Sequence, residues 1–323
     1  MSARFGLVVS NRNVVIADDT AADLLGIACR AEEHGLDDVW VGDSLGAKPR
    51  VESMALMSAI AARTSRVRIG PACMATTPLR DPILLAYQWS SLDQIAQGRT
   101  VFVACQGQVA PGNWPGEFNA WKYDPTTRTR RMVETIQILR RLSIEEHVSF
   151  QGEFCQFEDL TLEPRTIQQP LPIWIASSPS LSHPRNVETA YRRVASMADG
   201  WMTIGKTAEE VTRSLEYIRR FASEDGRALP ADFEACLYLN MNINESADAA
   251  FEESKRYMDT YYNTSFSRET LERTGALGPV DMCIRRIHDL VAAGVTTFAI
   301  RFMSYQQPAQ LERFVQKVLP AVQ

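Results

Sequence analysis

Eight short runs of β-favouring residues alternate with helical stretches along the whole chain, and this alternation is what most constrains the fold. The runs are apolar nearly throughout, as expected for strands of a parallel sheet that is covered by helices. They occupy residues 5–9, 38–42, 67–74, 100–105, 171–176, 200–204, 234–243 and 296–302. Eight such strands predict an α/β fold, a closed (β/α)8 TIM barrel.

An open, doubly wound sheet is the alternative fold. In a nicotinamide-binding sheet of that kind, the first strand is followed by a GxGxxG turn that binds the cofactor's phosphates. Residues 10–20, SNRNVVIADDT, contain no such turn. We therefore favour the barrel and expect residues 1–323 to form a single domain, because barrels of this size fold as one unit.

The helical stretches between the runs have recognisable ends. Thr20 with Asp23, and Thr207 with Glu210, have the spacing of a capping box at a helix N-terminus. Gly35 stands where a glycine ends a helix. These signals support helices between the strands.

One segment, about residues 143–171, breaks the alternation. The stretches VSF and EFCQF alternate in polarity around Gln151-Gly152, which predicts a β-hairpin inserted between the fourth and fifth barrel strands. We expect this hairpin to pack beside the barrel. A lid over the functional site is the alternative.

Charge and composition exclude several classes of function. The 34 Lys and Arg against 39 Asp and Glu give a net charge of −5, which argues against nucleic-acid binding. The chain begins without signal-peptide features and has no apolar stretch long enough to span a membrane, so we expect a cytoplasmic protein. The six Cys and four His show no metal-ligand spacing, so we expect no metal site.

In a barrel of this type, reacting groups lie at the carboxyl ends of the strands. The residues there include Asp43, Ser44, Thr203 and the ranges 72–77, 105–108, 177–178 and 301–304. Asp43 is the only carboxylate among them. The strand ends therefore offer few general acids or bases.

The end of the third strand is unusual. Pro71 removes a backbone donor from the sheet, and small residues follow it. A flat ligand that needs close approach of the backbone would explain this composition. A strand bulge with no ligand would explain it equally well.

Taken together, these features resemble the bacterial luciferase-like flavin-dependent monooxygenases and their relatives that use the deazaflavin F420. The resemblance covers nearly the whole chain in the family's order. The matching stretches are FGLVVS, AEEHGLDDVWVGDSL, RVRIGPACMATTPLRDPILLAYQWSSLDQIAQGRTVFVACQG, VSFQGEFCQFEDLTLEPRTIQQPLPIWIASS, ADGWMTIG and LERFVQKVLPAV.

The resemblance implies that a reduced flavin binds at the strand ends. It implies a non-proline cis peptide bond between Ala72 and Cys73 beside the flavin ring, with the Cys105 thiol near the same ring. The family's cofactor-phosphate positions correspond to Gln106, to the arginines at 128, 130 and 131, of which Arg128 is expected to face the phosphate, and to Ser177 and Ser178, with Thr203 close by. Luciferase has an arginine where this chain has Gln106, so one charged contact is missing.

The resemblance also separates two cofactors. F420-dependent relatives typically carry a histidine after the second strand and an acidic residue after the fourth, whereas this chain has Ser44, Gln106 and Gln108 there. Reduced FMN activates O2 itself, so its site needs hydrogen bonds and water exclusion more than a strong acid. We therefore expect an FMNH2-dependent monooxygenase. An F420-dependent hydride-transfer enzyme and a non-catalytic flavin-binding barrel are the alternatives.

The remaining site candidates follow from position alone. His183, Gln108 and Asp43 are candidate catalytic residues, and Ser44, Trp114 and Arg301 are candidates for a small-molecule substrate pocket. Arg301 suits either a substrate anion or a salt bridge at the barrel mouth. The family further implies a separate flavin reductase and a homodimer or homotetramer.

Overall fold

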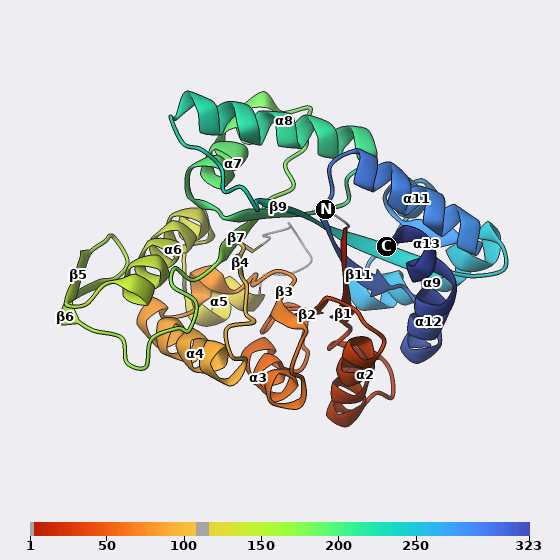
Figure 1. Cartoon of the computed structure of the whole chain (residues 1–323), viewed down its shortest axis with the longest axis horizontal. Helices are drawn as coiled ribbons and strands as arrows, with labels where there is room; N and C mark the ends of the chain where they lie inside the picture. The colour runs from red at the N-terminus through yellow and green to blue at the C-terminus, as the bar shows by residue number, and fades with distance from the viewer. Residues whose placement is uncertain (1–2, 108–115) are drawn as a thin grey trace.

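A computed structural model describes residues 3–107 and 116–323 of the chain, and its strands form a parallel barrel (Figure 1). Each of the eight predicted runs corresponds to one barrel strand. The strands are β1 (Arg4–Val9), β2 (Asp38–Val41), β3 (Arg68–Pro71), β4 (Phe102–Ala104), β7 (Ile173–Ala176), β8 (Gly200–Ile204), β9 (Glu234–Ile243) and β11 (Thr297–Phe302). They pair in the order β3-β2-β1-β11-β9-β8-β7-β4.

Two parallel bridges close the barrel between its first and last strands in this order. Ile69 pairs with Thr100, and Met74 pairs with Ala104. The Met74 amide donates to the carbonyl of Val103 at 2.9 Å. The predicted TIM-barrel fold is confirmed.

Helices surround the strands, as Figure 1 shows. Both predicted capping boxes are present, at Thr20 with Asp23 and at Thr207 with Glu210. The helices are α1 (Asn13–Ile16), α2 (Ala21–Glu33), α3 (Ser53–Arg63), α4 (Pro82–Ile95), α5 (Gly116–Trp121), α6 (Arg128–Ile144), α7 (Pro184–Met197), α8 (Ala208–Glu224), α9 (Ala247–Tyr262), α10 (Arg268–Thr274), α11 (Val280–Ala292), α12 (Gln307–Arg313) and α13 (Leu319–Val322).

The inserted hairpin is also confirmed. Strands β5 (Val148–Gln151) and β6 (Gln156–Leu160) pair antiparallel at the edge of the molecule beside α6 (Figure 1). The Glu134 carboxylate of α6 accepts backbone N–H groups from Glu153 and Phe154, which fixes the turn to the helix. A short strand that the sequence did not predict, β10 (Ala276–Gly278), pairs with β9.

Alternate residues of the barrel strands face the helices and the barrel interior. Phe5, Leu7 and Val9 of β1 belong to the large core between strands and helices, whereas Val8 points inward. The interior cluster consists of Val8, Trp40, Val101, Val103, Trp174, Met202, Cys236, Tyr238 and Ala299. The barrel is thus a packed core along most of its length.

An ion-pair network seals the amino end of the barrel. Arg68 of β3 donates to both carboxylate oxygens of Glu234 on β9 and, at 2.7 Å, to Asp38 on β2. Its guanidinium lies 4.9 Å from the ring centre of Trp174. These contacts connect four strands, β2, β3, β7 and β9, across the interior, so ligand access is left to the carboxyl end.

Candidate functional site

A cavity of about 650 Å³ opens at the carboxyl end of the barrel. This volume is typical of a pocket that binds a cofactor or a small molecule. Residues at or just after the ends of β2, β3, β4, β7, β8 and β11 line it, together with Tyr238 of β9 and side chains from α5, α6, α7 and α9.

Eleven of the sixteen residues singled out as site candidates from the sequence line this cavity. They come from separate strand ends and from the start of α6, and the barrel brings them together. They are Asp43, Ser44, Ala72, Cys73, Cys105, Gln106, Arg128, Ser177, Ser178, Thr203 and Arg301.

Five predicted residues are not placed there. Arg130 and Arg131 of α6 do not line the cavity. His183 is exposed at the start of α7, where its Nδ1 lies 3.0 Å from the hydroxyl of Ser182, and it does not line the cavity. A catalytic role for His183 stays a prediction. Gln108 and Trp114 lie outside the described residues.

The floor of the cavity contains the predicted bulge after β3. The peptide bond between Ala72 and Cys73 is cis, as the resemblance implies. The Cys73 and Cys105 thiols influence each other's ionisation. The neighbouring Cys73 thiol, the Gly107 backbone and Lys48 outweigh burial and lower the pKa of Cys105, whereas the pKa of Cys73 is raised.

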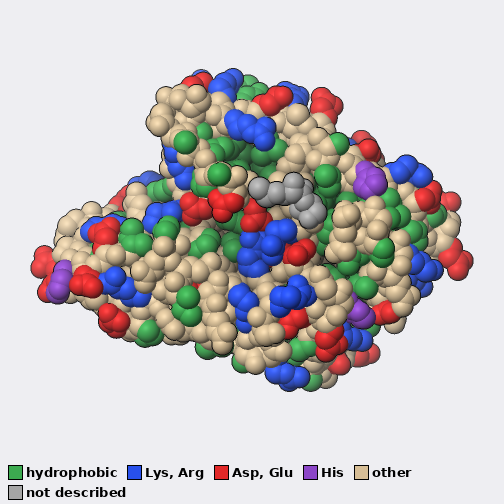
Figure 2. Space-filling model, viewed as in Figure 1, with side chains coloured by type: hydrophobic (Ala, Val, Ile, Leu, Met, Phe, Trp, Pro, Cys, Tyr) green, Lys and Arg blue, Asp and Glu red, His purple; other side chains and the backbone are tan. Residues whose placement is uncertain are grey.

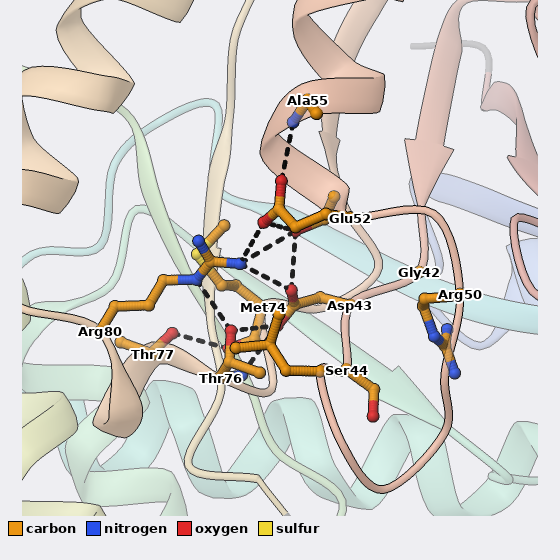
Figure 3. Close-up of polar contacts among 12 residues, drawn as sticks. Gly42, Asp43, Ser44, Arg50, Glu52, Ala55, Met74, Thr76, Thr77 and Arg80 are labelled. Carbon is orange, nitrogen blue, oxygen red and sulfur yellow. Dashed lines mark hydrogen bonds and ion pairs between the residues drawn. The ribbon is translucent and has the colours of Figure 1, made fainter. Parts of the chain in front are cut away.

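Asp43 holds the bulge in place (Figure 3). Its Oδ2 accepts from the backbone N–H of Thr76 at 2.8 Å and from the Thr76 hydroxyl at 2.7 Å. Its Oδ1 accepts from Ser53 at 2.7 Å and from Arg80 at 3.1 Å. Both carboxylate oxygens are thus engaged by protein donors, so the contacts favour a positioning role for Asp43 over proton transfer.

A second carboxylate, Glu117 of α5, enters the cavity and corrects the expectation of a site poor in acids. Its Oε1 accepts at 2.6 Å from both the Ser44 hydroxyl and the backbone N–H of Leu45. Ser44 in turn accepts from the backbone N–H of Lys48 at 3.0 Å. Glu117 lies far from any strand end in the sequence, so reasoning from strand ends could not find it.

One end of the cavity, here called the phosphate end, consists of Gln106, Arg128, Ser177, Ser178 and Arg193. The hydroxyls of Ser178 and Thr203 lie 2.8 Å apart, and Gln106 accepts from Thr129 at 2.5 Å. The buried Nε of Arg128 has no hydrogen-bond partner among the described residues.

Arg193 is the least compensated charge of the phosphate end. It lines the cavity from α7, and its guanidinium forms no hydrogen bond or ion pair with the described residues. Burial lowers its pKa. Asn186, Thr189, Ala190 and Arg193 follow helical spacing, so together they mark the face of α7 toward the cavity.

The other end, here called the cationic end, consists of Lys48, Arg50, Tyr261, Tyr262 and Arg301. Arg50 donates to the Tyr261 hydroxyl at 3.2 Å, and Arg301 donates to the Tyr262 hydroxyl at 3.0 Å. The Lys48 ammonium lies 4.7 Å from the ring centre of Tyr262. Figure 3 shows Arg50 and Ser44 pointing away from the contacts of Asp43.

The cavity carries the opposite charge to the protein as a whole. Among the described lining residues, the basic side chains are five and the carboxylates two, Asp43 and Glu117. The whole chain has a net charge of −5. Lys and Arg side chains also gather near the centre of the face shown in Figure 2. A cavity of this charge attracts anionic ligands.

Within 3–107 and 116–323, no three His, Cys, Asp or Glu side chains gather as a metal-binding group. None of the helices found in the same ranges is both long and apolar enough to cross a membrane.

Comparison with known proteins identifies the family. The family model for luciferase-like monooxygenases matches residues 3–297. An F420-dependent glucose-6-phosphate dehydrogenase from Amycolatopsis mediterranei is 24% identical over 92% of this chain and 93% of its own. An FMNH2-dependent dimethylsulfone monooxygenase from Pseudomonas putida is 26% identical over 90% of this chain and 84% of its own.

Solved structures agree on the fold. An F420-dependent secondary alcohol dehydrogenase superimposes with a TM-score of 0.82 over the full length of both chains, at 18% identity. These relatives use F420 or FMNH2, which are the two cofactors that the sequence indicated. The chain belongs to the luciferase-like monooxygenase family.

Proposed function

We propose that this protein is an FMNH2-dependent monooxygenase that acts on a small organic molecule. The observation that carries the proposal is the phosphate end of the cavity. There the Arg128 Nε is buried without a partner, and the Arg193 guanidinium is uncompensated among the described residues. Arginine forks and serine hydroxyls are the donors that a cofactor phosphate requires.

The floor of the cavity suits the flavin ring. Ala72 and Cys73 present a small surface at the bulge, next to Cys105. Asp43 keeps this bulge in register through its contacts with Thr76. When bound, reduced FMN would supply the electrons that activate O2. The residues of the chain would hold the ring, exclude water and direct the substrate to it.

An F420-dependent hydride-transfer enzyme is the second candidate, because Glu117 supplies the acid that the strand ends lack. Glu117 and Ser44 share a hydrogen bond of 2.6 Å inside the cavity. Such a pair could hold or donate a proton at the substrate during hydride transfer. The missing histidine at Ser44 and the missing acid at Gln108 still favour FMN.

The proposal extends to partners and organisation. Because no nicotinamide-binding motif is visible, a separate reductase would deliver reduced FMN. We further propose a single domain over residues 1–323 and a homodimer or homotetramer, as the family resemblance implies.

The decisive experiment measures anaerobic binding of FMNH2 and of reduced F420 to the purified protein. We expect FMNH2 to bind more tightly, followed by oxidation of the bound cofactor when O2 is admitted. Tight binding of F420 without binding of FMNH2 would reverse the choice of cofactor. Failure to bind either one would favour a barrel without this redox activity.

A further inference from the structure

The phenol groups at the cationic end have unused hydrogen-bond donors. Tyr261 accepts from Arg50 and Tyr262 accepts from Arg301, so each phenol oxygen is already an acceptor. A phenol also carries one O–H donor. Neither of these O–H groups donates to an acceptor among the residues that the structure describes. Two donors therefore remain for a ligand.

The arginines of this end also lack a negative partner. Arg301 is 1% exposed, and its contacts are with Asn240, Tyr262 and Met258. Arg50 contacts the Lys48 carbonyl and Tyr261. Within the described ranges, neither guanidinium forms an ion pair with a carboxylate. A buried charge without a counter-charge is costly, so an anionic ligand would be stabilised here.

The carboxylates of the cavity fill this role only in part, because the charge of Asp43 acts on Arg50 without a direct ion pair. Asp43 is bound by Arg80, Thr76 and Ser53, as Figure 3 shows for the first two. Glu117 is bound by Ser44 and by the Leu45 backbone through one oxygen. Positive charge on Arg50 and Arg301 is therefore available to a ligand.

The cofactor phosphate does not fill it either. The phosphate end is built from β4, β7, α6 and α7, whereas the cationic end is built from the loop after β2, from α9 and from β11. Around the closed barrel, β2 and β11 are the neighbours of β1. Strands β4 and β7 pair with each other on the opposite side. The two ends lie on different sides of the barrel mouth.

We propose that the cationic end is the substrate subsite and that it selects substrates carrying a carboxylate or a similar anionic group. The Tyr261 and Tyr262 hydroxyls and the Lys48 ammonium would donate to the anion, while Arg50 and Arg301 polarise the two phenols and supply charge. The identification of this ligand as the substrate rests on the proposed function. The binding of an anion at this end does not.

The test is calorimetric titration of the protein with benzoate and with benzamide, its neutral counterpart of similar shape. We expect benzoate to bind at least about 10-fold more tightly, a difference of about 1.4 kcal/mol. Tyr262→Phe and Lys48→Met should each remove most of that preference, with folding checked by circular dichroism. Equal affinity for the two probes, or benzoate binding that neither substitution changes, would refute the subsite.

Arg193→Gln is the matched control at the phosphate end. If benzoate binds at the cationic end, this substitution leaves benzoate affinity unchanged. Weaker benzoate binding in Arg193→Gln but not in Tyr262→Phe would place the anion at the other end and overturn the proposal. An FMNH2 titration of the unmodified protein separates the two ideas, because failure to bind FMNH2 with benzoate selectivity intact would contradict only the proposed function.

The anion subsite also predicts a pH dependence. Burial, together with the charge of Arg50, lowers the pKa of Lys48 from 10.5 to about 8. Tyr261, Arg301, Glu117 and Tyr262 also face this ammonium. Lys48 thus loses its charge as the pH rises through about 8, so benzoate affinity should fall by about 10-fold between pH 7 and pH 9.

Two substitutions at this position check the assignment. In Lys48→Arg the charge persists, so benzoate affinity should stay nearly level over the same pH range. In Lys48→Met affinity should be low throughout and show no step near pH 8. Burial opposes ionisation of Tyr261, but Arg50 and Arg301 outweigh it and lower its pKa. Ionisation of Tyr261 would add a negative charge, so it too would weaken anion binding as the pH rises. A flat profile in the unmodified protein would contradict the role of Lys48.

Discussion

Replacing Glu234 by Gln is expected to lower the free energy of unfolding by about 3 kcal/mol, because it leaves Arg68 short of negative charge at the barrel floor. Arg68 lies between Glu234 and Asp38, and Asp38 is fully buried. Asp38 alone would then balance two arginines, since Arg4 also contacts it at 3.0 Å. Urea denaturation followed by circular dichroism measures the change.

The same network predicts how stability changes in acid. Burial would raise the pKa of Glu234, but the hydrogen bonds and charge of Arg68 outweigh it and lower the pKa below its ordinary 4.5. The ionised form is therefore favoured by folding. Its contribution is present above about pH 4.5 and is lost as the pH falls through the folded-state pKa. Glu234→Gln should show a flatter loss of stability in this acidic range.

Glu153→Gln is the matched control for the floor network. Glu153 pairs with Arg130, but about half of each side chain is exposed, at 50% and 58%. Pairs this exposed contribute little, because water and salt screen them. We expect a change below about 0.5 kcal/mol. Similar losses in both variants would mean that the barrel floor has no special role in stability.

The fold was predictable because its signals are local. Parallel strands buried on both faces are apolar throughout, so the eight barrel strands could be located by composition and spacing alone. The capping boxes at Thr20 and Thr207 involve residues only three apart. Strand β10, with the sequence ALG, was missed because three residues carry no periodic pattern.

The cavity was predictable only in part, for a related reason. Residues that directly follow a strand, such as Ser44 and Arg301, must lie at the barrel mouth once the strand is assigned. Glu117, Arg193 and Tyr262 lie on helices, and their positions depend on how those helices pack. Three of the seven charged residues in the described lining of the cavity, Glu117, Arg128 and Arg193, come from helices.

For Asp43, the sequence predicts the position of the side chain but not its contacts. The sequence correctly indicates a carboxylate at the end of β2, but its partners lie in three other segments, at Ser53, Thr76 and Arg80. Only the assembled barrel shows that both oxygens are occupied. A residue type at a strand end therefore predicts location better than it predicts chemistry.

Arg193→Gln should bind FMN about 10- to 100-fold more weakly than the unmodified protein. A hydrogen bond to a charged group contributes about 1.5–3 kcal/mol, which corresponds to this range. Arg193 has no competing partner among the described residues, so its charge is free to meet a phosphate. Fluorescence titration with oxidised FMN, whose phosphate is that of the reduced form, measures the loss.

Riboflavin, which has the same ring system without the phosphate, makes this test specific. If Arg193 binds the phosphate, riboflavin affinity is the same in Arg193→Gln and in the unmodified protein, and only the advantage of FMN over riboflavin shrinks. Arg130→Gln is the matched control, because Arg130 pairs with Glu153 and does not line the cavity. Equal losses for FMN and riboflavin would instead show that Arg193 supports the shape of the cavity, and the phosphate would then have to be held by Arg128 and the serines alone.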